Sequence, residues 1–116
     1  MPKLTTFLTC QNIRYEKDAV TLFRVFETAA SGLDGFVVYL EIADLEGEQG
    51  FSFDIELEDV EGNLVVWQGD ELVPFIGART GFGRLIPLPR GFERGTYAVH
   101  LWLNGGLADT RMIYFR

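Results

Sequence analysis

Side chains that could act as nucleophiles or bases are scarce in this sequence. It contains one cysteine, Cys10, one histidine, His100, and two serines, Ser31 and Ser52. A thiol nucleophile needs a base within hydrogen-bond reach and a group that orients the base, so Cys10 with His100 is the obvious pair for such a site. Cys10 is, however, expected inside a strand among Phe7, Leu8 and Ile13, where a lone cysteine is usually a small buried hydrophobe. We therefore expect no catalytic residue, and we expect that the protein is not an enzyme.

Two acidic loops carry oxygen ligands of the kind that calcium binds, six to eight at a time. One loop contains Asp44, Glu46 and Glu48, and the other contains Asp59 and Glu61. Neither has the regular Asp-x-Asp spacing of a dedicated site, so we expect solvated turns. A single cysteine forms neither an internal disulfide nor a thiolate zinc cluster. The sequence thus predicts no metal and no other cofactor, and it favours a reducing, cytoplasmic location.

The segment from Gly77 to Arg84 is rich in glycine and arginine, a composition that can hold phosphate through backbone amides and guanidinium groups. The P-loop lysine, the third glycine of a dinucleotide fingerprint and a following helix are all missing. The net charge of −7 also opposes binding to nucleic acid, whose phosphates require a basic surface. No apolar stretch approaches the ~20 residues of a membrane helix, and the apolar run of a signal peptide is missing. We expect no nucleic-acid or membrane partner.

The elements that carry these residues are predicted to be strands. Residues 51–58 give the clearest pattern, because apolar Phe51, Phe53, Ile55 and Leu57 alternate with one serine and three acidic residues. Six further strands are expected at Leu4–Arg14, Ala19–Glu27, Phe36–Ala43, Leu64–Trp67, Tyr97–Leu103 and Leu107–Phe115.

Turn residues separate the predicted strands. Gly62-Asn63 and Asn104-Gly105-Gly106 are hairpin signals. Residues 75–95 contain many glycines and prolines and are expected to form irregular chain with one short strand at Arg84–Leu88. The pattern predicts one all-β domain over residues 1–116, an antiparallel sandwich of two sheets with seven to eight strands.

A short motif narrows the type of sandwich. Glu93-Arg94-Gly95-Thr96-Tyr97 fits the acidic-x-Gly-x-Tyr pattern that precedes the penultimate strand of many immunoglobulin-like domains. There the tyrosine hydroxyl bonds to the backbone a few residues upstream, which is called a tyrosine corner. We expect Gly95 and Tyr97 to form this corner; the alternative is a plain turn followed by a tyrosine at a strand edge.

Two stretches resemble a family of small uncharacterised bacterial proteins, a domain of unknown function. Cys10-Gln11-Asn12-Ile13-Arg14-Tyr15-Glu16 and the apolar run Val20–Phe26 are similar to the family's Cys-x-x-x-Arg-x-Glu opening and its next strand. Arg94–Tyr97 and the closing hairpin are similar to its end. The resemblance covers about half of the chain; it implies a β-sandwich and no assigned activity.

Charge and apolar patterning point to association. Residues 41–71 contain eleven Asp and Glu and no Lys or Arg, whereas residues 72–116 contain six Arg and two acidic residues. These charges can neutralise one another within the fold, which we favour, or between subunits. The closing hairpin also has apolar residues on both faces. Its second face, with Trp102, Ile113 and Phe115 beside His100, is therefore predicted to bind a partner protein or a second copy, most simply as a symmetric dimer.

His100 has two expected partners across this hairpin. A two-residue Asn104-Gly105 turn places it opposite Asp109, and a Gly105-Gly106 turn places it opposite Arg111. A second function class is a small-ligand or carbohydrate-binding module, in which exposed aromatic rings stack on sugars. Its candidate residues are Trp67, Trp102, Tyr39 and Tyr114.

Overall fold

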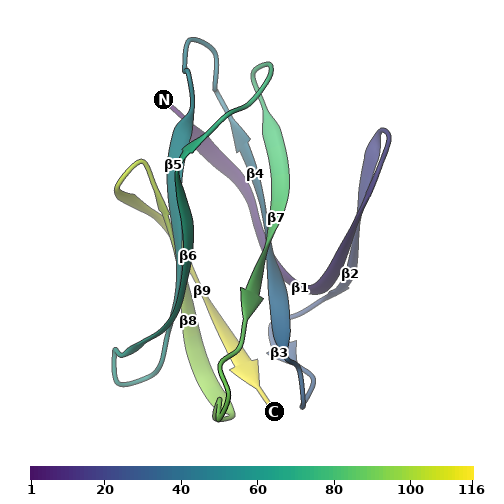
Figure 1. Ribbon diagram of the computed structural model, residues 1–116, viewed down its shortest axis with the longest axis vertical. Coiled ribbons are helices and arrows are strands. Elements are labelled where there is room, and N and C mark those ends of the chain that lie inside the picture. Colours follow the sequence, from purple (N-terminus) through teal and green to yellow (C-terminus); the bar gives the residue numbers. More distant parts are fainter.

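Nine β-strands make up the structure, a computed structural model that describes residues 1–116 (Figure 1). They are β1 (Lys3–Glu16), β2 (Ala19–Val25), β3 (Thr28–Ala29), β4 (Gly35–Ala43), β5 (Phe51–Glu58), β6 (Leu64–Val73), β7 (Thr80–Pro87), β8 (Gly95–Leu103) and β9 (Gly106–Phe115). The fold includes no helix that is long and apolar enough to cross a membrane.

The strands form two sheets that pack face to face, as the sequence predicts. One sheet has the order β2-β1-β4-β7 and the other has the order β3-β9-β8-β5-β6. All pairings are antiparallel except that of the two-residue strand β3 with β9. In Figure 1 the strands β5, β6, β8 and β9 lie on the left, β4 and β7 of the other sheet lie in the middle, and the β1–β2 hairpin lies on the right. The nine strands exceed the expected number because β3 is too short to leave a pattern in the sequence.

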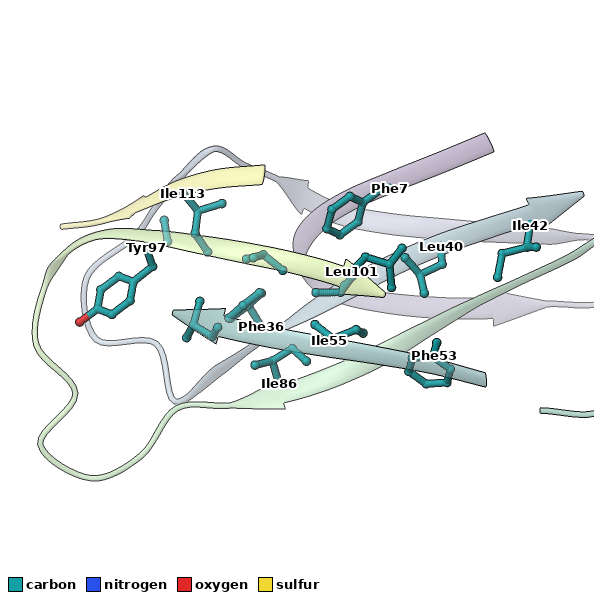
Figure 2. Packing of buried hydrophobic residues seen from close by; sticks show 14 of the residues in the cluster. Phe7, Phe36, Leu40, Ile42, Phe53, Ile55, Ile86, Tyr97, Leu101 and Ile113 are labelled. Atoms are coloured by element: carbon teal, nitrogen blue, oxygen red, sulfur yellow. The ribbon is translucent and has the colours of Figure 1, made fainter. Parts of the chain in front are cut away.

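The core lies between the two sheets and is built by strand alternation. The four apolar residues of β5 each have about 1% of their surface exposed, while the polar residues between them lie on the outer face. Burying a side chain of this size contributes roughly 1.5–3 kcal/mol. Figure 2 shows Phe53 and Ile55 of β5 directed toward Leu40 and Phe36 of β4. The core-facing and solvent-facing sides of β5 are those that the sequence predicts.

The expected hydrogen bond of the tyrosine corner is present. The Tyr97 hydroxyl donates to the carbonyl oxygen of Glu93 at 2.5 Å, and Gly95 has a φ of 142°, which favours glycine. The Phe92 ring stacks on Tyr97 with 4.7 Å between ring centres. The corner therefore fixes the connection between β7 and β8, where the chain crosses from one sheet to the other.

The short strand expected at Arg84–Leu88 is present as the second half of a longer strand, but the expectation of irregular chain before it is wrong. Residues Thr80–Pro87 form the regular strand β7, paired along β4. The two glycines of this strand lie close to neighbouring side chains. A Cβ atom on Gly81 would lie 2.7 Å from the Tyr39 hydroxyl, and one on Gly83 would lie 2.9 Å from side-chain carbons of Ile13 and Val37. Glycine here marks a close approach within a sheet and does not end the strand.

The hairpin β1–β2 packs over part of the outer face of its own sheet. Beyond Cys10, β1 leaves β4 and pairs only with β2, and Figure 1 shows this hairpin bent away from the other strands. The Tyr15 hydroxyl reaches back and accepts a hydrogen bond from the Gly83 amide at 2.6 Å. Beneath the hairpin Cys10, Val37 and Tyr39 are buried although they lie outside the main core. The chain itself thus covers part of a second apolar face, while Leu85 of β7 remains 60% exposed.

The predicted outer position of Ile113 and Phe115 is wrong. The closing turn is Asn104-Gly105, but a bulge at Ala108 shifts the register, so that Leu101 pairs with Asp109 and Trp102 pairs with Leu107. A shift of one residue moves every later side chain to the opposite face. Ile113 and Phe115 are consequently only 1% and 3% exposed, and Figure 2 shows Ile113 directed into the same interior as Leu101. The closing hairpin has one core face.

Candidate binding surface

The outer face of the five-stranded sheet has an acidic centre. Asp54, Glu56 and Glu58 project from it at alternate positions of β5, the strand between β6 and β8. The strands β5, β6 and β8 contain no Lys or Arg. In β9 the single cation, Arg111, donates to the backbone oxygen of Phe7 in the opposite sheet and so does not lie on this face. The row of carboxylates therefore has no full cation beside it.

Both tryptophans of the chain lie on this face and bond to the carboxylates. Trp67 Nε1 donates to Asp54 Oδ1 at 2.8 Å, and Trp102 Nε1 donates to Glu56 Oε1. Trp67 comes from β6 and Trp102 from β8, so the acidic strand lies between the two indoles. Each bond is diagonal, because Trp67 is directly opposite Glu56 and Trp102 is directly opposite Asp54. The bonds fix the orientation of both rings. We call the set Asp54, Glu56, Glu58, Trp67, Trp102 and His100 the acidic-aromatic face.

Gly69 lets the Trp67 ring lie close to the sheet. A Cβ atom at this position would lie 3.1 Å from Trp67 Cζ2, 3.0 Å from Asp54 Oδ1 and 2.5 Å from the backbone oxygen of Phe53. The Trp67 side chain nevertheless remains 53% exposed. One edge of the indole is thus bound to a carboxylate while much of the ring is open to solvent.

His100 bonds to neither of the two residues expected for it. Because of the bulge it pairs with Thr110, whose hydroxyl lies 2.8 Å from His100 Nδ1. On the other side His100 Nε2 lies 3.5 Å from Glu58 Oε2. The imidazole therefore joins β9 to the acidic row. The expectation of a cross-strand partner for His100 is confirmed, but the bulge makes that partner Thr110 in place of Asp109 or Arg111.

Exposed apolar side chains surround the acidic centre. Strand alternation places Leu64, Leu107, Met112 and Tyr114 on the same face, and about half of each side chain is exposed. Aromatic residues and methionine are enriched in protein interfaces relative to the rest of the surface. The Tyr114 exposure also shows the effect of the bulge, since its neighbour Phe115 occupies the core.

A shallow cavity of about 450 Å³ adjoins the exposed tryptophan. Its acidic lining residues are Asp54, Asp70 and Glu71, and Trp67 provides its large apolar surface. Asp70 forms an ion pair with Arg84 of β7, which lies 5.1 Å above the Phe53 ring at the edge of the sandwich. This is the one ion pair between the acidic segment 41–71 and the arginines of 72–116. The expected neutralisation within the fold is thus limited to a single pair.

The other residues considered for chemistry lie apart from this face. Cys10 is fully buried, and burial raises the pKa of its thiol. The Asp59 carboxylate accepts hydrogen bonds from the amides of Asn63 and Glu61, which lower the pKa of Asp59 and stabilise the β5–β6 turn. The structure contains no group of three or more His, Cys, Asp or Glu arranged to hold a metal ion.

Sequence reasoning identified His100 and Trp102 but missed the three carboxylates as members of one surface. The alternation in residues 51–58 places the acids on one face, and the turn at Gly62-Asn63 brings Trp67 beside them. These two signals together could have located the acidic-aromatic face. The indole bonds to Asp54 and Glu56 depend on diagonal register and could not be deduced from the pattern alone.

The two-sheet topology and the tyrosine corner define an immunoglobulin-like β-sandwich. No family model matches the sequence, and no curated protein shows significant similarity to it. Among solved structures, an immunoglobulin-like protein from Pseudomonas aeruginosa matches the whole chain over 97% of its own length, with a TM-score of 0.54 and 10% identity.

The chain is also similar to one part of a larger enzyme of known structure. The alkylpurine DNA glycosylase AlkC of Pseudomonas fluorescens, bound to DNA containing an abasic site analogue, matches 99% of this chain with a TM-score of 0.62 and 14% identity. The match spans 30% of the glycosylase chain. At these identities the two likenesses establish the fold alone.

Proposed function

We propose that this protein is a non-enzymatic interaction module whose acidic-aromatic face binds lysine or arginine side chains of a partner protein. The observation that carries the proposal is the row Asp54, Glu56 and Glu58 on a central strand whose neighbouring strands supply no Lys or Arg. The likeness to an immunoglobulin-like protein from Pseudomonas aeruginosa is consistent with a module of this kind. We also propose a cytoplasmic location, because the single cysteine is buried and forms no disulfide.

The chemistry of the face suits a cation. A guanidinium or ammonium group over an indole gains about 0.5–2 kcal/mol from the cation–π interaction, and a charge-assisted hydrogen bond adds roughly 1.5–3 kcal/mol. Trp67 offers an exposed ring and Asp54 a carboxylate in contact with that ring. Since both indoles are already fixed by hydrogen bonds, little side-chain entropy is lost when a partner binds.

A symmetric dimer through this face is less favourable than a basic partner. A two-fold axis would bring the row of carboxylates on one copy against the same row on the other. Such like charges oppose association unless a cation lies between them. Self-association through this face is therefore the alternative that the experiment below must distinguish from binding of a basic partner.

The two other classes fit the surface less well. The glycosylase in the comparison is bound to DNA, but carboxylates repel phosphates and the chain carries a net charge of −7. Sugar binding requires aromatic rings gathered in one concave patch. Tyr39 is buried under the β1–β2 hairpin on the other sheet, where burial and the nearby Glu41 raise its pKa, so the four candidate rings do not form one patch.

A peptide titration tests the proposal. The chain has two tryptophans, so its ¹H–¹⁵N spectrum contains two indole signals, both from the acidic-aromatic face. A Gly-Arg repeat peptide should shift both signals in a saturable manner, and a Gly-Glu repeat peptide of equal length should not. Equal shifts with both peptides, or none with either, would contradict the proposal. Light scattering on the free protein provides the competing outcome: a dimer that dissociates when Trp102 is replaced by alanine favours self-association over a basic partner.

A further inference from the structure

The lower end of the sandwich contains a cavity that is basic despite the acidic character of the chain. The cavity has a volume of about 730 Å³ and is lined by the β3–β4 connection, the β7–β8 connection and the end of β9. Three arginines line it, Arg90, Arg94 and Arg116, against one acid, Asp34. In Figure 1 this end lies at the bottom, beside the C-terminus.

We propose that this cavity binds a small organic anion in which a flat apolar ring carries one carboxylate or phosphate group. Two of the three arginines, Arg90 and Arg94, form no side-chain hydrogen bond or ion pair, whereas Arg116 Nε donates to the Ala29 carbonyl oxygen at 3.4 Å. The four ion pairs of the structure involve Arg14, Arg84, His100 and Arg111, so the arginines of the cavity have no carboxylate within 4.0 Å. Guanidinium groups bind carboxylate and phosphate in a bidentate manner.

Apolar side chains supply the place for the ring. Phe92 and Phe115 line the cavity together with Leu33 and Leu88. The Phe92 ring contacts Phe115 edge to face with 4.9 Å between ring centres and stacks on Tyr97 at 4.7 Å. The cavity volume falls in the range of about 300–1,000 Å³ that is usual for small-molecule sites.

The two connections that form the cavity are held in place by hydrogen bonds. The Leu88 amide donates to the Asp34 carbonyl oxygen at 2.8 Å and so joins the two connections directly. The Phe92 amide donates to the Pro89 carbonyl oxygen at 3.1 Å, and the tyrosine corner follows at once. A site held in this way loses little entropy on binding. The carboxylate of Asp34 opposes a second negative group, which favours a ligand with one anionic head.

Four probes test the ligand class on the full chain at constant ionic strength. Phenyl phosphate and benzoate carry both a ring and an anion, inorganic phosphate lacks the ring, and phenol lacks the charge. We expect saturable amide shifts in residues 30–34 and 88–94 with the first two probes and much weaker shifts with the other two. The stronger of the first two identifies the head group. Binding of inorganic phosphate as tight as that of phenyl phosphate would overturn the role of the ring, and shifts that do not saturate with any probe would overturn the site.

Matched variants test the arginines. Arg90→Gln with Arg94→Gln should weaken binding of the better probe by about tenfold or more, because two charge-assisted contacts are lost. Arg14→Gln with Arg79→Gln removes the same charge elsewhere and should change it less than about twofold. Arg94→Lys keeps the charge but cannot form two parallel hydrogen bonds to the anion, so it should give an intermediate loss of affinity. Equal effects of the two double variants would overturn the proposal. The result does not depend on whether the acidic-aromatic face binds a partner.

Discussion

Replacing Phe115 by alanine tests the register that the bulge imposes on β9. Phe115 is 3% exposed, whereas its neighbour Tyr114 is 45% exposed on the outer face. A hairpin without the bulge would exchange the two positions, so the two alanine variants distinguish the registers. The Phe115 ring lies within 4.9 to 6.5 Å of four other ring centres, those of Phe92, Tyr97, Phe36 and Phe26.

Removal of a buried phenylalanine side chain typically costs about 3–5 kcal/mol, since both burial and packing are lost. The upper half of this range applies here, because the lost contacts are aromatic pairs that each add roughly 0.5–1.5 kcal/mol. Tyr114→Ala should cost about 1 kcal/mol or less. With a urea m value of about 2 kcal/mol/M, Phe115→Ala lowers the unfolding midpoint by roughly 2 M and Tyr114→Ala by at most about 0.5 M.

Equilibrium urea unfolding followed by tryptophan fluorescence measures both midpoints. The m values must agree between variants for the comparison of midpoints to report stability. A larger loss for Tyr114→Ala than for Phe115→Ala would refute the bulged register and return Phe115 to the outer face.

Three further predictions concern packing and ionisation. Gly83→Ala should lower stability by about 1–3 kcal/mol, because its new Cβ atom lies 2.9 Å from two side-chain carbons; a thermal midpoint equal to that of the wild type would contradict the close approach of the hairpin. Tyr97→Phe should cost about 1 kcal/mol through loss of the bond to Glu93, measured by urea unfolding, with no cost if the corner is merely a plain turn. The Cys10 thiol should resist alkylation in the native protein at pH 8 and react fully in urea. Burial raises the pKa of the Cys10 thiol in the folded protein above the value of 9.0 for a free thiol. The unfolded chain therefore loses this proton first, so the free energy of unfolding should fall as the pH rises above about 9. Urea midpoints measured from pH 8 upward would detect the fall.

The sequence predicts the features of the fold that depend on short-range patterns. Strand β5 begins and ends at the predicted residues, because its alternation reports directly which side faces the core. Tyr97 and Gly95 likewise lie where their local motif places them. Features that depend on contacts between distant segments are not predictable in this way. In the sequence the glycines of β7 suggest a loop. The structure shows instead that Gly83 lies in a strand, directly against the side chain of Ile13.

In the candidate surface, too, short-range features could be predicted and features that depend on strand register could not. The acidic side of β5 and the outward direction of His100 follow from alternation. The bulge at Ala108 does not, because a single extra residue in a strand has no strong sequence signal, and it reverses the faces of Ile113 and Phe115. Without the bulge the closing hairpin suggests two apolar faces. With the bulge the hairpin has one core face, and its outer face borders the carboxylates of β5.

The binding of a Gly-Arg repeat peptide to two charge-matched variants tests the central claim most directly. The test variant carries Asp54→Asn, Glu56→Gln and Glu58→Gln. The control variant carries Asp44→Asn, Glu46→Gln and Glu48→Gln in the β4–β5 connection. Both variants lose the same charge, and the amide oxygens of the test variant can still accept the indole hydrogen bonds.

The test variant should lose about tenfold or more in affinity, whereas the control should change by less than about twofold at physiological salt, where charges beyond ~8 Å are screened. Equal losses in both variants would mean that the peptide responds to net charge alone and would contradict a specific cation-binding face.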